Sequence, residues 1–289
     1  MLIALELNVC AGESLLYKVA KRWIAGQNQD SLIIEAKRSN ANGMGAMGNY
    51  LGEDIKDPAT ADAHAQEYVT LQNALAWNGV RGCASVKLTQ LGLGGEDDWA
   101  PRRLELLASN AERLDQFLWV DMESSAVTSQ TLDIFETALT RHKRIGIAIQ
   151  AYLRRSESDA KHLLDRGATV RLVKGAYREP EGIIFPTRKE VSRSYASLLN
   201  LLFERGNNFA VGTHDSKLIE YAKRLAESKH VNFEFQFLKG IRDDLKVELV
   251  KSGYKVSEYL PYGASWMAYS KRRLSEHPSN VWLLLRSLV

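Results

Sequence analysis

Residues 144–151 have the sequence Arg-Ile-Gly-Ile-Ala-Ile-Gln-Ala, and residues 169–176 have the sequence Thr-Val-Arg-Leu-Val-Lys-Gly-Ala. Both runs are largely apolar and short enough to be buried strands. The segment between them, residues 156–167, has the pattern of a helix that ends at Gly167. A strand, a helix and a second strand in this order are typical of a parallel βαβ unit.

The same alternation extends over most of the chain. Eight apolar runs occur, at residues 44–52, 82–91, 116–122, 144–151, 169–176, 208–213, 232–238 and 255–260. Helical segments follow them at residues 58–77, 98–115, 129–142, 156–167, 189–206, 216–228, 241–252 and 265–288. No composition break separates these units, which predicts an α/β fold: one domain over residues 1–289, with a (β/α)8 TIM-type barrel and final helix at residues 43–289. A doubly wound open sheet is the alternative.

Additional helices are expected before the barrel, at residues 14–25 and 30–37, so that residues 1–40 form an N-terminal helical part. Residues 43–48 then have the sequence Gly-Met-Gly-Ala-Met-Gly, a literal G-x-G-x-x-G. This motif binds a dinucleotide only when a strand precedes it and a helix begins within it, and neither condition is met here. We therefore interpret the glycines as part of a tightly packed first strand.

The composition is that of an ordinary globular protein: 289 residues, 45% hydrophobic, 25% charged, with a formal net charge of +3. No basic block of the kind that tracks nucleic acid occurs, so no nucleic-acid partner is expected. The apolar start contains Glu6, Glu13 and Lys18 and no basic leader, which predicts a cytoplasmic chain without signal peptide or membrane span. Cys10 and Cys83 lie outside any C-x-x-C motif and the six histidines lack metal-ligand spacing, so neither a disulfide nor a metal site is expected.

Polar residues stand at the ends of most predicted strands, which is where a parallel barrel carries its chemistry. These residues are Lys87, Asp121, Gln150, Arg171, Lys174, Thr213, His214 and Tyr259. Cations this close together repel one another, which favours an anionic guest. Further along, Trp266, Tyr269 and Arg273 recur at helical spacing beside Arg272, and two arginine forks suit a small carboxylate between aromatic walls. The alternative is a solvated Arg–Arg pair on an amphipathic helix.

With these motifs in place, the chain resembles the proline dehydrogenases, FAD-dependent (β/α)8 barrels that oxidise L-proline. The resemblance rests on Ser85-Val-Lys-Leu, Val120-Asp-Met-Glu, Ile149-Gln-Ala-Tyr, Arg171-Leu-Val-Lys-Gly-Ala-Tyr177, Thr213-His, residues 233–245, and Tyr262-Gly-x-x-Trp-x-x-Tyr-x-x-Arg-Arg-Leu-x-Glu276. The continuation Arg178-Glu-Pro is similar to the short, monofunctional bacterial type. The resemblance implies a flavin held without a Rossmann domain.

The resemblance also implies the reaction and its partners. L-Proline would be oxidised to Δ1-pyrroline-5-carboxylate, the electrons would pass to a quinone, and a separate pyrroline-5-carboxylate dehydrogenase would act downstream. Because a quinone is the acceptor, peripheral contact with the inner face of the membrane is the most that is expected.

Carried over residue by residue, the resemblance assigns the site. The residues that would bind or enclose the substrate are Lys87, Tyr259, Tyr269, Arg272 and Arg273. The residues that would contact the cofactor are Met122, Gln150, Arg171, Lys174, Gly175, Ala176, Thr213 and His214. Asp121 and Arg171 would be the catalytic residues, since Asp121 would orient the cationic cluster and a fixed cation at Arg171 would stabilise negative charge on the reduced flavin. Asp215 departs from the family pattern, because many relatives carry asparagine there.

Glu53 ends the first predicted strand. In a closed barrel the loop after strand one lies beside the helix after strand eight. Glu53 is therefore predicted to act as a gate that pairs with Arg272 or Arg273 once proline is bound. The alternative is an exposed carboxylate without a role.

Two other functions remain compatible with a barrel of this kind. A lysine at the end of a strand also fits a Schiff-base lyase or aldolase, with Lys174 as the nucleophile. A non-catalytic barrel that binds proline is the third possibility. A yellow protein whose flavin is reduced by proline distinguishes the dehydrogenase from both.

Overall fold

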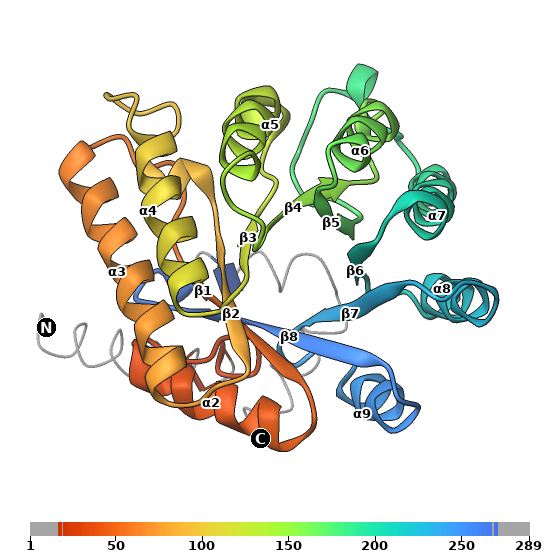
Figure 1. The fold of residues 1–289 in the computed structure, drawn as a ribbon, viewed down its shortest axis with the longest axis horizontal. Helices are drawn as coiled ribbons and strands as arrows, with labels where there is room; N and C mark the ends of the chain where they lie inside the picture. The colour runs from red at the N-terminus through yellow and green to blue at the C-terminus, as the bar shows by residue number, and fades with distance from the viewer. Residues whose placement is uncertain (1–16, 19, 268, 271–289) are drawn as a thin grey trace, which may run out of the picture.

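The computed structural model describes residues 17–18, 20–267 and 269–270. Eight parallel strands form a closed barrel in the order β1 to β8 (Figure 1). The strands are β1 (Gly45–Tyr50), β2 (Gly82–Val86), β3 (Leu118–Val120), β4 (Ile145–Gln150), β5 (Thr169–Val173), β6 (Asn208–Gly212), β7 (Asn232–Leu238) and β8 (Lys255–Tyr262). The barrel closes because β1 pairs with β8, from Gly45 with Ser257 to Tyr50 with Tyr262. The predicted (β/α)8 fold is confirmed, and the open sheet is excluded.

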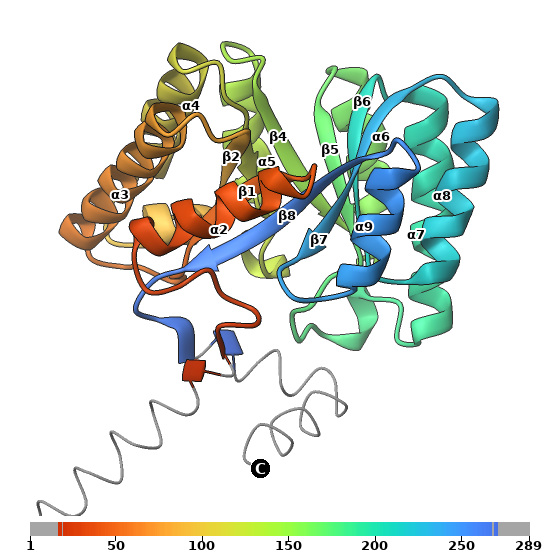
Figure 2. The ribbon, with the colours of Figure 1, turned by 90° about the horizontal axis from the view of Figure 1, so that it is seen from below.

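Helices surround the barrel. They are α2 (Gln29–Ala41), α3 (Pro58–Trp77), α4 (Ala100–Arg113), α5 (Ser125–Leu139), α6 (Ser156–Asp165), α7 (Arg188–Arg205), α8 (Ser216–Ser228) and α9 (Asp243–Lys251). Helices α3 to α9 each follow a strand, whereas α2 precedes the barrel and covers the outside of β1 and β8 (Figure 2). Helix α2 contains the expected helix at residues 30–37. The helix expected at residues 14–25 is shorter than predicted, because residues 17, 18 and 20 are helical whereas residues 21–25 form a turn and irregular backbone. Most of the helix expected at residues 265–288 lies outside the described residues, although residues 266–267 and 269–270 are helical.

The glycines of the G-x-G-x-x-G sequence lie in and next to β1, as predicted. A Cβ atom on Gly45 would stand 2.5 Å from the hydroxyl oxygen of Ser257 on the neighbouring strand. A Cβ atom on Gly48 would stand 3.1 Å from the side chains of both Leu32 in α2 and Leu71 in α3. Small residues are therefore needed on both faces of this strand. Because Gly45 and Gly48 lie within β1 and no helix begins among residues 43–48, this is not the strand-to-helix turn that binds a dinucleotide.

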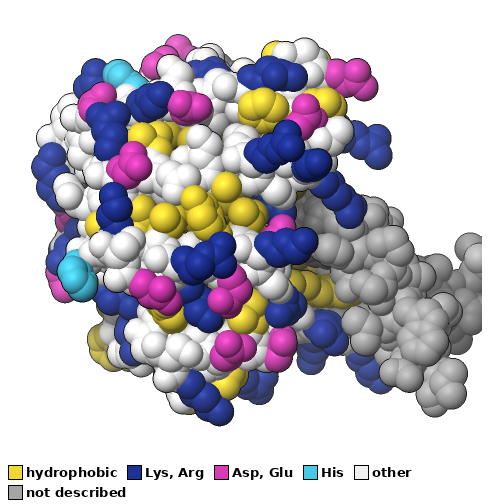
Figure 3. Space-filling model, turned by 90° about the vertical axis from the view of Figure 1, so that its right-hand side faces the viewer, with side chains coloured by type: hydrophobic (Ala, Val, Ile, Leu, Met, Phe, Trp, Pro, Cys, Tyr) yellow, Lys and Arg dark blue, Asp and Glu magenta, His cyan; other side chains and the backbone are white. Residues whose placement is uncertain are grey.

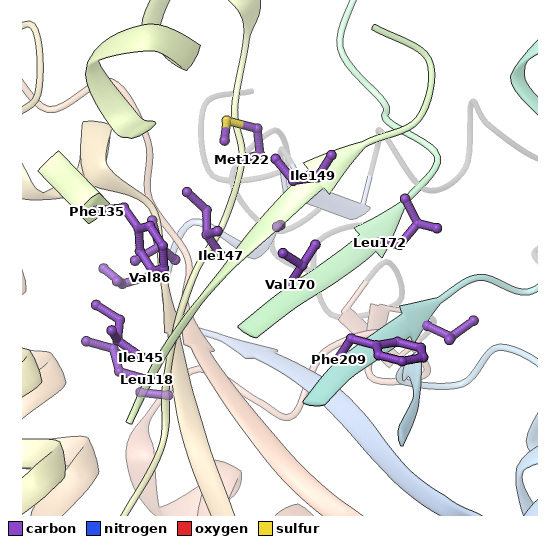
Figure 4. Close-up of a cluster of buried hydrophobic side chains, with 14 of the residues drawn as sticks. Val86, Leu118, Met122, Phe135, Ile145, Ile147, Ile149, Val170, Leu172 and Phe209 are labelled. Atoms are coloured by element: carbon purple, nitrogen blue, oxygen red, sulfur yellow. The ribbon is translucent and has the colours of Figure 1, made fainter. Parts of the chain in front are cut away.

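The hydrophobic core lies between the strands and the surrounding helices. Figure 4 shows part of it, with labelled side chains Val86, Leu118, Met122, Phe135, Ile145, Ile147, Ile149, Val170, Leu172 and Phe209, all of them buried. Strand residues alternate between the two faces of the sheet, so the residues between these apolar ones point into the barrel. The inward positions include the buried polar residues Ser85, Arg171 and Gln236. The apolar packing thus holds a polar interior in place.

Several predicted strands were too long, and the largest excess is at residues 82–91. The apolar run at residues 82–91 contains β2 and then a single-turn 3-10 helix, η1 (Leu88–Leu91). Its residues remain buried, so hydrophobicity alone could not mark the end of the strand at Val86. The turn ends at Gly92, whose φ of 92° suits glycine. Lys87 therefore stands at the junction of strand and turn.

None of the helices in the described part of the chain is both long enough and apolar enough to span a bilayer.

Candidate active site

Arg171 lies inside the barrel on β5 and is buried. Its guanidinium forms an ion pair with Asp121 and lies 3.1 Å from Ser85 Oγ and 3.3 Å from Gln236 Oε1. The guanidinium carbon lies 4.9 Å from the centroid of the Trp119 ring, a cation–π distance. Because arginine remains charged in proteins, its burial requires such partners. Residues of β2 and β7, and of β3 with the position that follows it, thus fix this cation in one position.

Asp121 follows β3 and receives hydrogen bonds on both carboxylate oxygens. Ser85 Oγ donates to Oδ1 at 2.8 Å, and the hydroxyl of Tyr259 donates to Oδ2 at 2.7 Å. Burial and, next, the charge of Asp121 raise the pKa of Tyr259 well above its usual value, so the phenol stays protonated and donates. Ser85, Asp121, Arg171 and Tyr259 therefore form one polar network, which we call the inner network.

Two further cations at the C-terminal ends of the strands have carboxylate partners. Lys87, after β2, forms an ion pair with Glu53 from the loop after β1. Lys174, after β5, lies 2.8 Å from Asp215 at the start of α8. Partial burial acts to raise the pKa of Asp215, but the hydrogen bond and charge of Lys174, together with the amides of Lys217 and Leu218, outweigh it and the pKa is lowered. Arg171, Lys87 and Lys174 each have a carboxylate partner, so repulsion among these cations does not by itself indicate an anionic guest.

The remaining residues assigned to the cofactor lie at the ends of β3 to β6. Gln150 is buried, and its Nε2 donates to the main-chain oxygen of Glu123 at 2.8 Å. His214 accepts a hydrogen bond on Nε2 from the Leu238 amide at 3.1 Å, so in a neutral ring the proton is on Nδ1. Met122 and Thr213 are buried and Ala176 is exposed.

Position 175 requires glycine for two structural reasons. Its φ is +103°, and a Cβ atom there would lie 2.1 Å from the ring of Tyr152. The Tyr152 amide also donates to the Lys174 carbonyl at 2.9 Å. Only glycine therefore fits at this position, and the backbone of residues 174–176 is held against the loop after β4.

The structure reveals a group of cations that the sequence analysis missed. A hollow of about 780 Å3 lies between the first turns of α7 and α8. It is lined by Arg188, Lys189, Ser192, Arg193, Ala196, Asp215, Ser216 and Lys217. Figure 3 shows this side of the molecule, where Lys and Arg side chains gather toward the upper right. The lining cations come from two helices far apart in the sequence, so no local motif signals them.

The structure thus divides the predicted site residues into groups. Asp121, Arg171 and Tyr259 meet in the inner network, and Lys87 pairs with Glu53. Tyr269 is buried in a cluster with Trp23, Ile24 and Trp266. Arg272 and Arg273 lie outside the described residues.

A family model described as proline dehydrogenase matches residues 32–283, which include every residue assigned to the site. The chain belongs to the proline dehydrogenase family. Proline dehydrogenase 1 of Bacillus subtilis subsp. natto is 35% identical over 273 residues, covering 93% of this chain and 90% of that protein. Proline dehydrogenase of Deinococcus radiodurans is 32% identical over 283 residues, covering 95% of this chain and 91% of that protein. The resemblance inferred from the motifs is confirmed.

A solved structure of a longer protein shares the fold. Proline utilization A (PutA) from Bdellovibrio bacteriovorus, inactivated by N-propargylglycine, superposes with a TM-score of 0.85 at 26% sequence identity. The match covers 93% of this chain but only 33% of the PutA chain. This proline dehydrogenase family member therefore corresponds to about one third of that protein.

Proposed function

We propose that this protein oxidises L-proline to Δ1-pyrroline-5-carboxylate with a bound FAD, and that the electrons then pass to a quinone. Membership of the proline dehydrogenase family carries the proposal, because the match spans the strand ends where the charged groups of the barrel converge. A separate pyrroline-5-carboxylate dehydrogenase consumes the product. The enzyme acts in the cytoplasm and reaches its quinone by peripheral contact with the membrane.

The chemistry of the hollow between α7 and α8 supports a dinucleotide cofactor. Four cations line it against the single carboxylate of Asp215, and two helix N-termini add partial positive charge. Such a donor set suits the pyrophosphate of FAD. Asp215 also pairs with Lys174, which connects the hollow to the end of β5, three residues beyond Arg171. Thr213 and His214 immediately precede Asp215, between β6 and α8.

The reacting end of the cofactor belongs over the inner network. When bound, FAD supplies a two-electron acceptor for the hydride that leaves C5 of proline. Arg171 provides a fixed positive charge whose position is already set by Asp121 and Trp119, so no reorganisation is needed during the reaction. Gln150 and the backbone at Met122, Gly175 and Ala176 border this position.

In this proposal Lys87, Arg272 and Arg273 bind the proline carboxylate, and of these three the structure describes Lys87. Its present partner, Glu53, is 42% exposed at the side chain, whereas Lys87 is 13% exposed. A substrate carboxylate competes with Glu53 for the same ammonium group. Glu53 then moves to Arg272 or Arg273 and acts as the gate, which excludes water from the substrate. Tyr259 and Tyr269 enclose the proline ring.

The Lys174 ion pair argues against the aldolase alternative. A Schiff-base nucleophile is activated by desolvation or by a neighbouring cation. Lys174 instead faces the Asp215 carboxylate at 2.8 Å, and its side chain is 36% exposed. These surroundings favour binding of an anion over nucleophilic attack.

An anaerobic absorbance spectrum tests the proposal. The purified protein should be yellow, and L-proline should bleach the flavin band while releasing the cyclic imine product. A colourless protein that borohydride inactivates through Lys174 in the presence of a carbonyl substrate would establish the aldolase. A protein that binds proline with an unchanged spectrum would be a non-catalytic barrel.

A further inference from the structure

Thr89 connects three loops at the mouth of the barrel. It lies in η1, two residues after Lys87. Its amide donates to Glu123 Oε1 at 3.0 Å, and its hydroxyl donates to Glu123 Oε2 at 2.5 Å. Its hydroxyl also accepts from the Asp54 amide at 3.1 Å, and its carbonyl accepts from the Ile55 amide at 3.0 Å. The loop that carries Glu53 is therefore attached to Thr89, and Thr89 is attached to Glu123.

Glu123 lies two residues after Asp121, in the loop between β3 and α5, and is 3% exposed. Both of its carboxylate oxygens bind Thr89, and its main-chain oxygen accepts from the Gln150 side chain at 2.8 Å. A buried carboxylate needs hydrogen bonds to offset its lost hydration, and here the amide and hydroxyl of one residue supply them. Burial raises the pKa of Glu123, although the Thr89 bonds and the Lys87 charge act to lower it.

The position of Glu123 matters because Lys87 is the N-cap residue, immediately before η1. A shift of Thr89 would move the backbone next to Lys87. It would also move the loop after β1, which holds Glu53 in its ion pair with Lys87. The hydroxyl of Tyr68 contacts Gln90 Oε1 at 3.0 Å, so η1 has a second attachment on the side of α3. Gln90 Nε2 also donates to the Tyr50 carbonyl at the end of β1 at 2.9 Å, so η1 is held from α3, from β1 and from the β3 loop. Asp54 and Ile55, the residues next to Glu53, are bound through Thr89.

We infer that Glu123 is a positioning residue. Through Thr89 it fixes the positions of Lys87 and of the loop that carries Glu53 relative to Gln150, whose side chain binds the Glu123 carbonyl. The inference rests on the proposed function, in which Lys87 and Glu53 handle the substrate carboxylate. Glu123 itself does not react with proline. It links the half of the mouth that binds the substrate to the half that borders the cofactor.

Thr89→Val tests the link, because it removes the hydroxyl but keeps the shape and the amide. A matched control is Thr131→Val in α5, since Thr131 is also buried and its hydroxyl has no hydrogen-bond partner in the described part of the chain. We expect Thr89→Val to raise the KM for proline about ten-fold, the loss typical of a hydrogen bond to a charged group, with kcat nearly unchanged. Thr89→Ser should restore the KM, and Thr131→Val should leave it unaltered.

Hydrogen–deuterium exchange supplies a readout that is independent of catalysis. The amides of Asp54 and Ile55 should exchange several-fold faster in Thr89→Val than in the unmodified protein or in Thr131→Val, because the loop opens locally. Glu123→Gln should act in the same direction, since an amide group offers only one acceptor oxygen. Combining Thr89→Val with Glu123→Gln should add little to either change, because both break the same contact.

The outcomes separate this inference from the proposed function. Equal KM and equal exchange rates in the two valine variants would overturn the positioning role, even in an enzyme that oxidises proline. A fall in kcat alone, with exchange unaltered, would overturn it as well. If the unmodified protein failed to oxidise proline, the proposed function would fail, while faster exchange at residues 54–55 would still establish the Glu123–Thr89 link.

Discussion

Glu258 and Tyr259 are consecutive residues of β8, yet they belong to two different buried networks. Side chains alternate between the two faces of a strand. Glu258 points outward, where it lies 2.5 Å from the ammonium of Lys246. Tyr259 points inward, where it donates to Asp121, the partner of Arg171. One strand therefore connects an ion pair outside the barrel, which we call the outer pair, with the inner network.

The two ion pairs are buried to a similar degree. Side-chain exposure is 1% for Lys246 and 12% for Glu258, against 5% for Arg171 and 13% for Asp121. Their surroundings differ, because the outer pair lies between β8 and the helices α2 and α9, whereas the inner network lies at the C-terminal ends of the strands. Burial alone therefore does not separate the ion pair that we propose serves the reaction from one that stabilises the fold.

The largest expected effect on stability comes from breaking the outer pair. Lys246→Met keeps the length of the side chain but leaves Glu258 buried without its cation. We expect the free energy of unfolding to fall by about 3–5 kcal/mol, measured by urea denaturation, with kcat/KM of the folded enzyme unchanged.

Lys223→Met provides the control, because Lys223 forms an ion pair with Glu220, which is half exposed. Exposed pairs contribute about 0–1 kcal/mol. An equal loss of stability in the two methionine variants would mean that the outer pair is not a significant anchor of the barrel.

Asp121→Asn should affect the activity much more than the stability, the opposite of Lys246→Met. The amide keeps the shape of Asp121 but loses the charge that fixes Arg171, so we expect kcat/KM to fall about 100-fold, the effect of a misplaced catalytic group. Stability should fall by only about 1–2 kcal/mol, because Arg171 keeps Gln236 and the Trp119 ring. Steady-state kinetics measures the loss of kcat/KM, and urea denaturation of the same preparation measures the loss of stability. Near-normal turnover with bound flavin would remove Asp121 from the mechanism.

A smaller change can be made on each side of β8 by deleting one hydroxyl donor. Tyr259→Phe removes the donor to Asp121, and Ser39→Ala removes the donor that binds Glu258 Oε2 at 2.8 Å. Each should cost about 1 kcal/mol of stability, but only Tyr259→Phe should lower kcat/KM, by about ten-fold if the loss appears in the transition state. If Ser39→Ala lowered kcat/KM equally, the two networks would be coupled through β8.

The sequence predicted the alternation of strands and helices because each apolar run is local, and it predicted that polar residues gather at the strand ends because parallel strands end on the same side. It placed Asp121 among the cations of the site, but it did not predict which side chains pair. Glu53 was expected to pair with Arg272 or Arg273 once proline is bound, whereas in the structure it pairs with Lys87. Asp121 and Arg171 are 50 residues apart, and only the closed barrel brings them together. Glu258 was overlooked for the same reason, since nothing near it indicates that Lys246 covers it. The cations around the hollow were missed because Arg188 and Lys217 belong to different helices.

A third charged cluster differs from both pairs in that one member titrates near neutral pH. His142 lies between Glu105 and Glu112 of α4, with ring nitrogens 2.9 and 3.0 Å from their carboxylates. Burial acts to lower the pKa of His142, but the two carboxylates outweigh it and raise the pKa above the usual 6.5.

A raised folded-state pKa means that the folded protein binds the proton more tightly than the unfolded chain does. The stabilisation by His142 is therefore complete below about pH 6.5, the unfolded value, and is lost as the pH rises through the folded value. His142→Gln should lower the free energy of unfolding more at pH 6 than at pH 9, by about 0.5–1 kcal/mol. Ser39→Ala, which involves no imidazole, should show the same loss at both pH values. An equal loss in His142→Gln at the two pH values would show that the histidine acts only through neutral hydrogen bonds.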